Sequence, residues 1–273
     1  MTQYDILSRA SAFAIDITSI AKEANVTRPS EKQFPETDEE IISTVGFHPI
    51  VTSLHVVRPF LFPRYYPEEW LQFVRPENIR VTLEFRDNET GELKHEFPLL
   101  PKVFAHPTRD VALLFADLDA ISEAKEQDID VVGAVERIAY LEDAVDKHQL
   151  VDVDNTIGKK LVCCGHFLNE NPDSESCKPQ PGIVVGEVAH TLDDPDMILA
   201  GTELILQAGM CGGPVVDEEG NCVGMVEGVV QNAPADGQFK DGLAALLPSR
   251  TIRELAIQVL EGESGERHHP PHN

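Results

Sequence analysis

Short runs in which apolar and polar positions alternate dominate the first half of the chain. Alternation with a period of two is typical of half-buried strands. It predicts strands at residues 41–45, 50–57, 79–85 and 93–99, and the apolar run at residues 111–115 is a further strand candidate. Residues 88–91 (Asn-Glu-Thr-Gly) predict a hairpin turn between two of these strands. Near the N-terminus, residues 11–17 alternate like a strand, although residues 15–24 equally fit a short helix.

The pattern changes after the first group of strands. Between residues 119 and 149, apolar residues recur every three or four positions among charged ones, which predicts an amphipathic helical connection. The final segment, residues 248–260, predicts a helix with Ser249 as its N-cap and one apolar stripe. Between these helical segments, strands are predicted at residues 160–164, 182–189, 197–199, 203–207, 215–216 and 222–226.

Two groups of short strands separated by a helical stretch predict an all-β fold of two β-barrels in series, followed by a helix. The chain then divides into five parts, in which the N-terminal barrel precedes the connection, the C-terminal barrel, the closing helix and a disordered tail. Their boundaries are 1–118, 119–155, 156–247, 248–262 and 263–273.

Composition narrows the class of protein. Hydrophobic residues make up 42% and charged residues 25% of the 273 residues, which is typical of a soluble globular chain with a sizeable core. No stretch approaches the roughly 18–20 consecutive apolar residues that a membrane span requires, and the first twenty residues do not resemble a secretory signal. The odd number of cysteines, five, argues against a disulfide framework. We therefore expect a cytoplasmic or nuclear protein that does not bind membranes.

The net charge is strongly negative, because 47 acidic residues face 22 basic ones and leave a formal charge of −25. Such a chain repels a phosphate backbone, so we expect no binding to nucleic acid. The acidic surface either aids solubility or attracts basic substrates and partners, and the sequence leaves both interpretations open.

Candidate chemistry centres on residues 209–214, Gly-Met-Cys-Gly-Gly-Pro. Acyl transfer requires a nucleophile, a base, a group that orients the base, and donors for the oxyanion. Glycines let this backbone turn tightly, so the N–H groups of Gly209 and Cys211 would form an oxyanion hole around Cys211 as the nucleophile. The alternative interpretation is a glycine-rich hairpin that holds a buried cysteine.

The other two members of a triad are candidates by their order in the chain. His55 follows an apolar run and Asp110 precedes one, and each alone is also typical of a structural or turn residue. The order His55, Asp110, Cys211 is that of base, orienting acid and nucleophile in chymotrypsin. The lengths of chain between these three residues allow one barrel to supply His55 and Asp110 and the second barrel to supply Cys211.

These segments resemble the trypsin-like peptidases, and within them the HtrA/Deg-like branch. Val-Thr-Ser-Leu-His-Val-Val is similar to the family's Leu-Thr-Ala-Ala-His-Val-Val, and Gly-Met-Cys-Gly-Gly-Pro is similar to its Gly-Asn-Ser-Gly-Gly-Pro. The matches run in order over roughly residues 45–260, in segments 51–57, 109–114, 160–166, 181–188, 209–216 and 246–252.

The resemblance implies two six-stranded β-barrels of the chymotrypsin fold, with a helical insertion and a C-terminal helix. It implies an endopeptidase in which His55 is the general base, Asp110 orients it and Cys211 forms a covalent acyl-enzyme, with a polypeptide as partner and no cofactor. Cysteine at the nucleophile position departs from the family and resembles the viral chymotrypsin-like cysteine proteases. The oligomeric state stays open.

The resemblance also implies a substrate pocket beside the strand that begins at residue 223. Its lining would comprise Ile205, Val226, Glu227 and Gly228. Isoleucine favours a small or apolar residue before the scissile bond (the P1 residue), whereas Glu227 would favour a basic one. We expect the apolar preference.

Two other functions fit parts of the sequence. Because cysteine replaces serine, the chain also fits an inactive relative that binds peptides without cleaving them. Cys163, Cys164 and His166 suggest metal ligands, but adjacent strand residues point to opposite faces and do not easily hold one ion. We therefore expect no metal.

Overall fold

The structure of the protein is a computed structural model that describes residues 7–24, 49–87, 89–117, 150–151, 157–168, 179–193, 196–207, 209–231 and 241–262. The strand predicted at 41–45, most of the helical connection predicted within 119–155 and the tail 263–273 lie outside these ranges.

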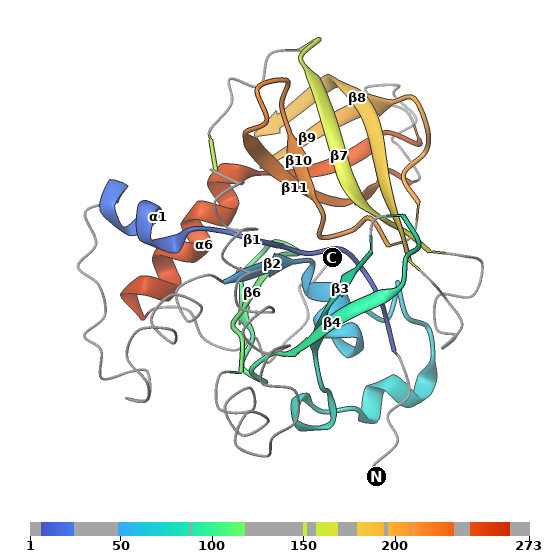
Figure 1. The fold of residues 1–273 in the computed structure, drawn as a ribbon, viewed down its shortest axis with the longest axis vertical. Coiled ribbons are helices and arrows are strands. Elements are labelled where there is room, and N and C mark those ends of the chain that lie inside the picture. The colour runs from blue at the N-terminus through green and yellow to red at the C-terminus, as the bar shows by residue number, and fades with distance from the viewer. Residues whose placement is uncertain are drawn as a thin grey trace.

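The second half of the chain forms a closed antiparallel barrel, at the top of Figure 1. Side chains along its longest strand alternate between exposed and buried, as a half-buried strand requires. Its core is apolar and includes Leu161, Met210 and Leu246. The barrel follows the order β10-β11-β12-β9-β8-β7, with strands β7 (Lys160–Phe167), β8 (Gln180–Asp193), β9 (Asp196–Thr202), β10 (Pro214–Val216), β11 (Cys222–Val229) and β12 (Ala244–Pro248).

In the described residues, the first half also contributes six strands. A bridge between Leu99 and Ala116 joins its hairpin to its larger sheet. Within the described ranges, only the second barrel is closed. The predicted all-β fold of chymotrypsin type is confirmed. The larger sheet has the order β1-β2-β6-β5, with β1 (Phe13–Ala14), β2 (Ile50–Thr52), β5 (Phe104–Ala105) and β6 (Ala112–Leu114), and the hairpin pairs β3 (Thr82–Arg86) with β4 (Leu93–Pro98).

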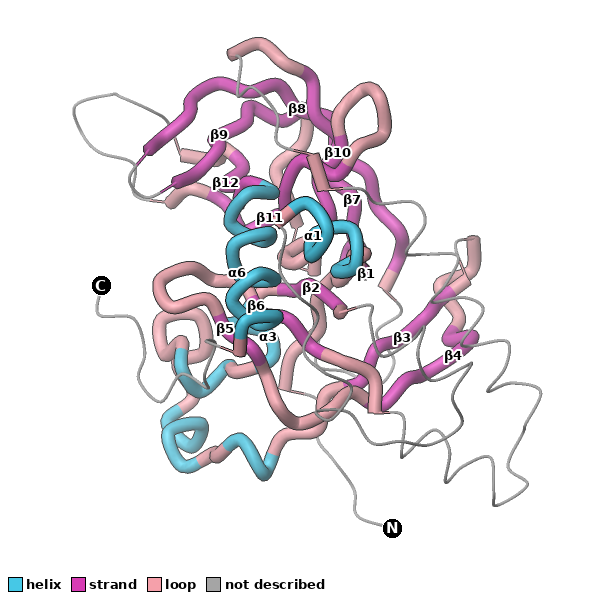
Figure 2. The backbone as a smooth tube through the Cα atoms, turned by 90° about the vertical axis from the view of Figure 1, so that its left-hand side faces the viewer, coloured by secondary structure: helices cyan, strands magenta, loops and turns pink. Residues whose placement is uncertain are grey.

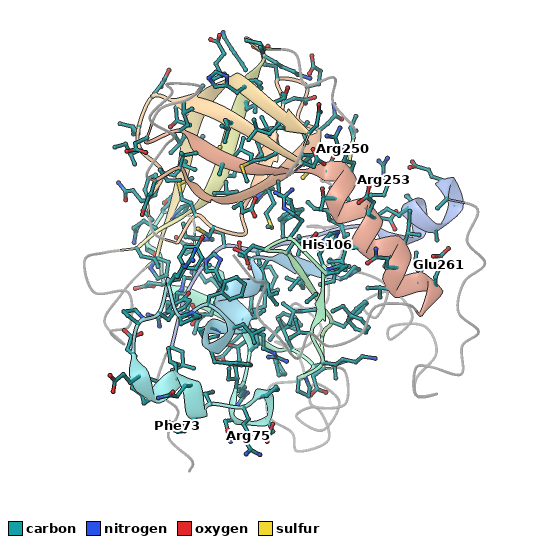
Figure 3. All side chains as sticks on the ribbon, turned by 180° about the vertical axis from the view of Figure 1, so that it is seen from behind. Phe73, Arg75, His106, Arg250, Arg253 and Glu261 are labelled. Carbon is teal, nitrogen blue, oxygen red and sulfur yellow. The ribbon has the colours of Figure 1, made fainter. Side chains whose placement is uncertain are left out.

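Helices lie at the ends and joints of these sheets. The closing helix is confirmed, and Figure 2 shows α1 packed beside it. Figure 3 shows Arg250, Arg253 and Glu261 along its length, whereas Phe73 lies far away on η3. The helices are α1 (Ile17–Glu23), α3 (Leu54–Val57) and α6 (Ser249–Glu261), with 3₁₀ turns η2 (Pro59–Leu61), η3 (Glu69–Phe73) and η4 (Pro76–Asn78).

A shared apolar cluster joins the two halves. It contains Phe13 from β1, Val51 from β2, Met225 from β11 and Leu255 from α6, all of them buried. The strand β1 runs along the joint between the two halves (Figure 1). Because both halves bury side chains in one cluster, the ends of their strands are held in a fixed relation, and the candidate site lies at this joint.

Several local predictions differ from the structure. The run 50–57 is a strand only as far as Thr52, because the N–H of His55 bonds to the Asp110 side chain and the chain turns into α3. The run 203–207 is a loop in which Leu204 and Ile205 are exposed. The N-cap of α6 is Pro248 rather than Ser249.

Strands β5 and β12 were not predicted. The five residues of β12 are all buried, so the strand has no alternation for a period of two to detect. Strand β5 has only two residues, which is too short for any periodic pattern.

Candidate active site

His55 and Asp110 lie together at the end of the first half. Strand β2 leads into α3 and β6 follows Asp110, so the pairing of Thr52 with Ala112 in these neighbouring strands brings the two residues together. Nδ1 of His55 lies 2.5 Å from Oδ2 of Asp110, and the backbone N–H of His55 donates to Oδ1 at 2.8 Å. The carboxylate therefore fixes both the ring and the backbone of His55, as an orienting acid would.

The turn that carries Asp110 is held by another histidine. Nδ1 of His106 accepts hydrogen bonds from the backbone N–H groups of Thr108 at 3.3 Å and Arg109 at 3.1 Å. Its own backbone N–H donates to the carbonyl of Val111 at 3.1 Å. Figure 3 shows His106 between the sheet of the first half and α6. The side chain of Asp110 thus projects from a turn whose backbone is already fixed.

The pKa of His55 is set by opposing effects. Burial lowers it, but the hydrogen bonds to Asp110 and to Cys211 and the negative charges of these two groups raise it, and the balance brings the pKa from 6.5 to about 10. The imidazolium form is therefore favoured at neutral pH. The interaction with Cys211 spans the two halves of the molecule, because Cys211 precedes β10 in the second barrel.

Cys211 differs from the other described cysteines. Burial raises the pKa of the thiols of Cys163 and Cys222 to about 12, and it also raises the pKa of Cys164. Cys211 is partly exposed and, of these four, it is the one that interacts with His55 and raises the pKa of its ring. A reactive thiol requires access and a nearby positive charge, and Cys211 has both.

The backbone around Cys211 matches the predicted loop. Gly209 has φ of +96° and Gly212 has φ of +81°, values that favour glycine. The N–H of Gly212 donates to the carbonyl of Val226 at 2.8 Å, and the N–H of Val226 donates to Gly213 at 2.9 Å. Among the described residues, no backbone carbonyl accepts the N–H of Gly209 or of Cys211. These are the two donors that the sequence predicts for an oxyanion hole.

The residues predicted to line the substrate pocket divide into two groups. Ile205 is 69% exposed, and a side chain added at Gly228 would meet no atom within 4 Å, so both border open space. The side chain of Val226 is buried in the core of the second barrel. The carboxylate of Glu227 is bound by Arg109. The prediction that Val226 and Glu227 line the pocket therefore requires correction, because neither side chain is available there.

The ion pair between Arg109 and Glu227 was missed in the sequence. A guanidinium nitrogen of Arg109 lies 2.8 Å from Oε2 of Glu227, and the side chains are 9% and 16% exposed. Arg109 also donates to the carbonyl of Asp196. Burial raises the pKa of Glu227, Arg109 opposes this shift, and smaller contributions come from Asp110 and His55. The pair therefore lies near enough to His55 and Asp110 for their charges to influence Glu227, and it links the first half to β11.

Aromatic side chains surround the ring of His55. Tyr65 stacks on it with centroids 5.0 Å apart and an interplanar angle of 26°, and Phe62 meets it edge-on at 6.0 Å. Tyr66 lies at 6.3 Å. The side chain of His55 is only 9% exposed, whereas Tyr65 is 64% exposed. Sequence reasoning missed this cover, although three aromatic residues soon after a candidate base are a visible signal.

Other classes of site find no support in the described ranges. No three His, Cys, Asp or Glu side chains in these ranges form a group that could hold a metal ion. Cys163 points into the barrel core, away from its neighbour Cys164. Among the helices that the structure describes, none is long and apolar enough to cross a membrane.

A closed antiparallel barrel, a second β unit that supplies His55 and Asp110, and a cysteine on a glycine-rich loop between them define a chymotrypsin-type fold. No protein-family model matches the sequence, and no curated protein matches it either.

Solved structures similar to this chain are HtrA-type proteases at low identity. The HtrA-type protease AlgW with a decapeptide is 14% identical with a TM-score of 0.46, and the match covers 79% of this chain and 49% of AlgW. Deg5 is 14% identical with a TM-score of 0.46 and 81% coverage of both chains. The apo MamO protease domain from Magnetospirillum magneticum is 14% identical with a TM-score of 0.40. The match covers 76% of this chain and 81% of the MamO domain. This chain thus spans about half the length of AlgW.

The buried ion pair predicts a large loss of stability when one partner is removed. Glu227→Ala leaves the charge of Arg109 buried and unpaired, so we expect the free energy of unfolding to fall by about 3–5 kcal/mol. The exposed pair of Lys160 and Glu218 is the control, since its side chains are 65% and 61% exposed, and Glu218→Ala should cost less than about 1 kcal/mol. Urea unfolding measures both. Equal losses in the two variants would contradict the role of the buried pair.

Proposed function

We propose that the protein is an endopeptidase of trypsin-like fold that cleaves peptide bonds through Cys211, His55 and Asp110. The observation that carries the proposal is the placement of His55 between Asp110, which is 2.5 Å from its Nδ1, and Cys211, which is near enough to raise the pKa of the ring. Asp110 occupies Nδ1 of the ring, which leaves Nε2 for the thiol and for the leaving group. A nucleophile, a base and an orienting acid in this arrangement are the minimum set for acyl transfer.

The raised pKa of His55 favours a mechanism through an ion pair. With the imidazolium present at neutral pH, Cys211 attacks the scissile carbonyl as a thiolate. The new C–S bond places negative charge on the carbonyl oxygen, which the N–H groups of Gly209 and Cys211 bind. The imidazolium then gives its proton to the leaving amine as the C–N bond breaks. Water, deprotonated by His55, hydrolyses the thioester and releases the second product.

A second function, peptide binding without turnover, is favoured by one specific observation. Tyr65, Phe62 and Tyr66 surround His55 and leave its side chain 9% exposed. In a binding module such a cover would persist when a peptide is bound. In an enzyme Tyr65 would form part of the wall against which the peptide lies, because its own ring is 64% exposed. The two functions differ in whether Cys211 reacts.

Thiol reactivity separates these two functions. In the enzyme we expect iodoacetamide at pH 7 to alkylate Cys211 at least about 10-fold faster than the partly exposed Cys164, because an imidazolium stabilises the thiolate. His55→Ala should lower that rate by about 10–100-fold, and Cys211→Ala should abolish cleavage of a protein substrate. Peptide mass spectrometry measures the labelling of each cysteine.

If Cys211 labels no faster than Cys164 in the native protein, and no acyl-enzyme forms with an activated peptide ester, the enzymatic function is wrong. Tight binding of the same peptides by that protein would then establish the binding module. Cys164→Ser is the matched control, since removing this thiol should leave the labelling rate of Cys211 unchanged.

The lining of the pocket supports an apolar P1 residue. Ile205 is exposed beside the loop and Glu227 is occupied by Arg109, so no free carboxylate from Glu227 remains to bind a basic side chain. We expect peptide esters with Leu at P1 to show kcat/KM at least about 10-fold higher than those with Arg, since each buried methylene contributes about 0.8 kcal/mol. Glu227→Gln should leave this ratio unchanged. A preference for Arg that Glu227→Gln removes would reverse the assignment.

The pKa of His55 predicts how stability depends on pH. Its folded-state pKa of about 10 lies above the unfolded value near 6.5, so its contribution to stability is fully present below pH 6.5 and is lost as the pH rises to about 10. We expect the difference in unfolding free energy between the native protein and His55→Gln to shrink across this window. Urea unfolding from pH 6 to 10.5 measures it. A difference that is constant across the window would contradict the raised pKa.

A further inference from the structure

Residues 209–213, which we call the nucleophile loop, are bound by a residue near the start of the chain. The backbone N–H of Ser11 donates to the carbonyl of Cys211 at 3.0 Å, and its hydroxyl donates to the carbonyl of Gly209 at 2.7 Å. One residue therefore holds two carbonyls of the loop, one on each side of Met210. Neither carbonyl belongs to a regular strand, so the conformation of this loop depends on contacts of this kind.

Ser11 is itself fixed by both halves of the molecule. Its hydroxyl accepts the N–H of His166, on β7 of the second barrel, at 2.9 Å. Its carbonyl accepts the hydroxyl of Thr52, on β2 of the first half, at 2.8 Å. Ser11 is 3% exposed, and β1 begins two residues further along and runs between the two halves (Figure 1). These contacts leave Ser11 little freedom to move.

Glycines provide the space that these contacts require. A Cβ atom at Gly212 would lie 2.3 Å from the carbonyl oxygen of Ser11, and one at Gly165 would lie 2.8 Å from its hydroxyl oxygen. The segment before β1 therefore packs directly against the backbone of the nucleophile loop and of β7. Any larger residue at Gly212 would displace either the loop or Ser11.

The bonds to Ser11 fix the peptide planes next to the proposed oxyanion donors. The Cys211 N–H belongs to the peptide between Met210 and Cys211, and the two planes on either side of it are those whose carbonyls Ser11 holds. The carbonyl of the central plane accepts the N–H of Gly213 at 3.0 Å. Since a peptide is planar and its N–H and C=O point in opposite directions, the bond from Gly213 sets the direction of the Cys211 N–H, and the bonds from Ser11 fix the two peptide planes that flank it.

We propose that Ser11 is a positioning residue: by fixing the peptide planes on either side of the Met210–Cys211 peptide, it keeps the N–H of Cys211 directed at the oxyanion. This inference rests on the proposed peptidase function. Ser11 acts through the backbone of the loop, and its hydrogen bonds within the described part of the chain reach neither the thiol of Cys211 nor the ring of His55. Its removal should therefore weaken reactions that form an oxyanion and spare reactions of the thiol that form none.

The test compares Ser11→Ala with Ser249→Ala. Both serines are buried, at 3% and 2% exposure, and the hydroxyl of Ser249 donates to the carbonyl of Val151 at 2.8 Å, away from the nucleophile loop. Acylation by an activated peptide ester passes through an oxyanion, and losing one donor of such a hole lowers rates by about 10²–10³-fold. Because loss of the Ser11 hydroxyl displaces the loop, we expect Ser11→Ala to lower the acylation rate by about 10–100-fold. Alkylation by iodoacetamide forms no oxyanion and should stay within about twofold of the native rate. Ser249→Ala should change neither rate by more than about twofold.

Hydrogen exchange of the backbone provides a second measurement that does not require activity. Ser11→Ala should increase exchange of the Gly212 and Gly213 amides, and Ser249→Ala should not. If the native protein neither acylates nor labels rapidly, the proposed function fails, and the exchange result alone decides whether Ser11 holds the loop. Equal exchange in the two variants, or parallel losses of acylation and alkylation in Ser11→Ala, would overturn the positioning role.

Discussion

The ion pair between Arg109 and Glu227 is the electrostatic constraint on which the arrangement of the site depends. Moving two charges out of water is costly, and only close pairing offsets that cost, so these side chains specify how the two halves dock. Arg109 is adjacent to Asp110 in sequence, and Glu227 lies on β11, whose neighbour Val226 bonds to the nucleophile loop. The contact between Asp110 and His55 is therefore positioned relative to Cys211 by a buried pair that takes no part in the chemistry.

Apolar packing and this ion pair act together at the joint between the halves. The shared cluster of Phe13, Val51, Met225 and Leu255 supplies non-directional attraction. The ion pair and the hydrogen bonds of Ser11 supply direction, because each requires its partner at a defined distance. A relay assembled from two separate β units needs both kinds of contact, since a small displacement of one unit would separate His55 from Cys211.

Local motifs were sufficient to predict part of this site. His55, Asp110 and Cys211 each lie in a short recognisable segment, and the glycines around Cys211 reveal a tight turn whatever the rest of the fold. Tyr65 was missed although it follows His55 closely in the sequence, because the sequence alone does not show that its ring stacks on the histidine. Ser11 and Arg109 were missed because their roles depend on residues far away in sequence. Glu227 was misinterpreted for the same reason. A charged residue in an apolar strand suggests a group that binds substrate, and the sequence does not show that Arg109 is its partner. The strand β12 was missed because burial on both faces removes the alternation that identifies strands.

The bond between Ser11 and Gly209 joins residues 198 positions apart in the chain. Contacts of such long range close a large loop and form late, after the local structure on either side has been established. The nucleophile loop therefore reaches its final shape only when the beginning of the chain and the second barrel have met. A partly synthesised chain that lacks the second barrel has no partner for Ser11, and the loop around Cys211 is complete only in the whole fold.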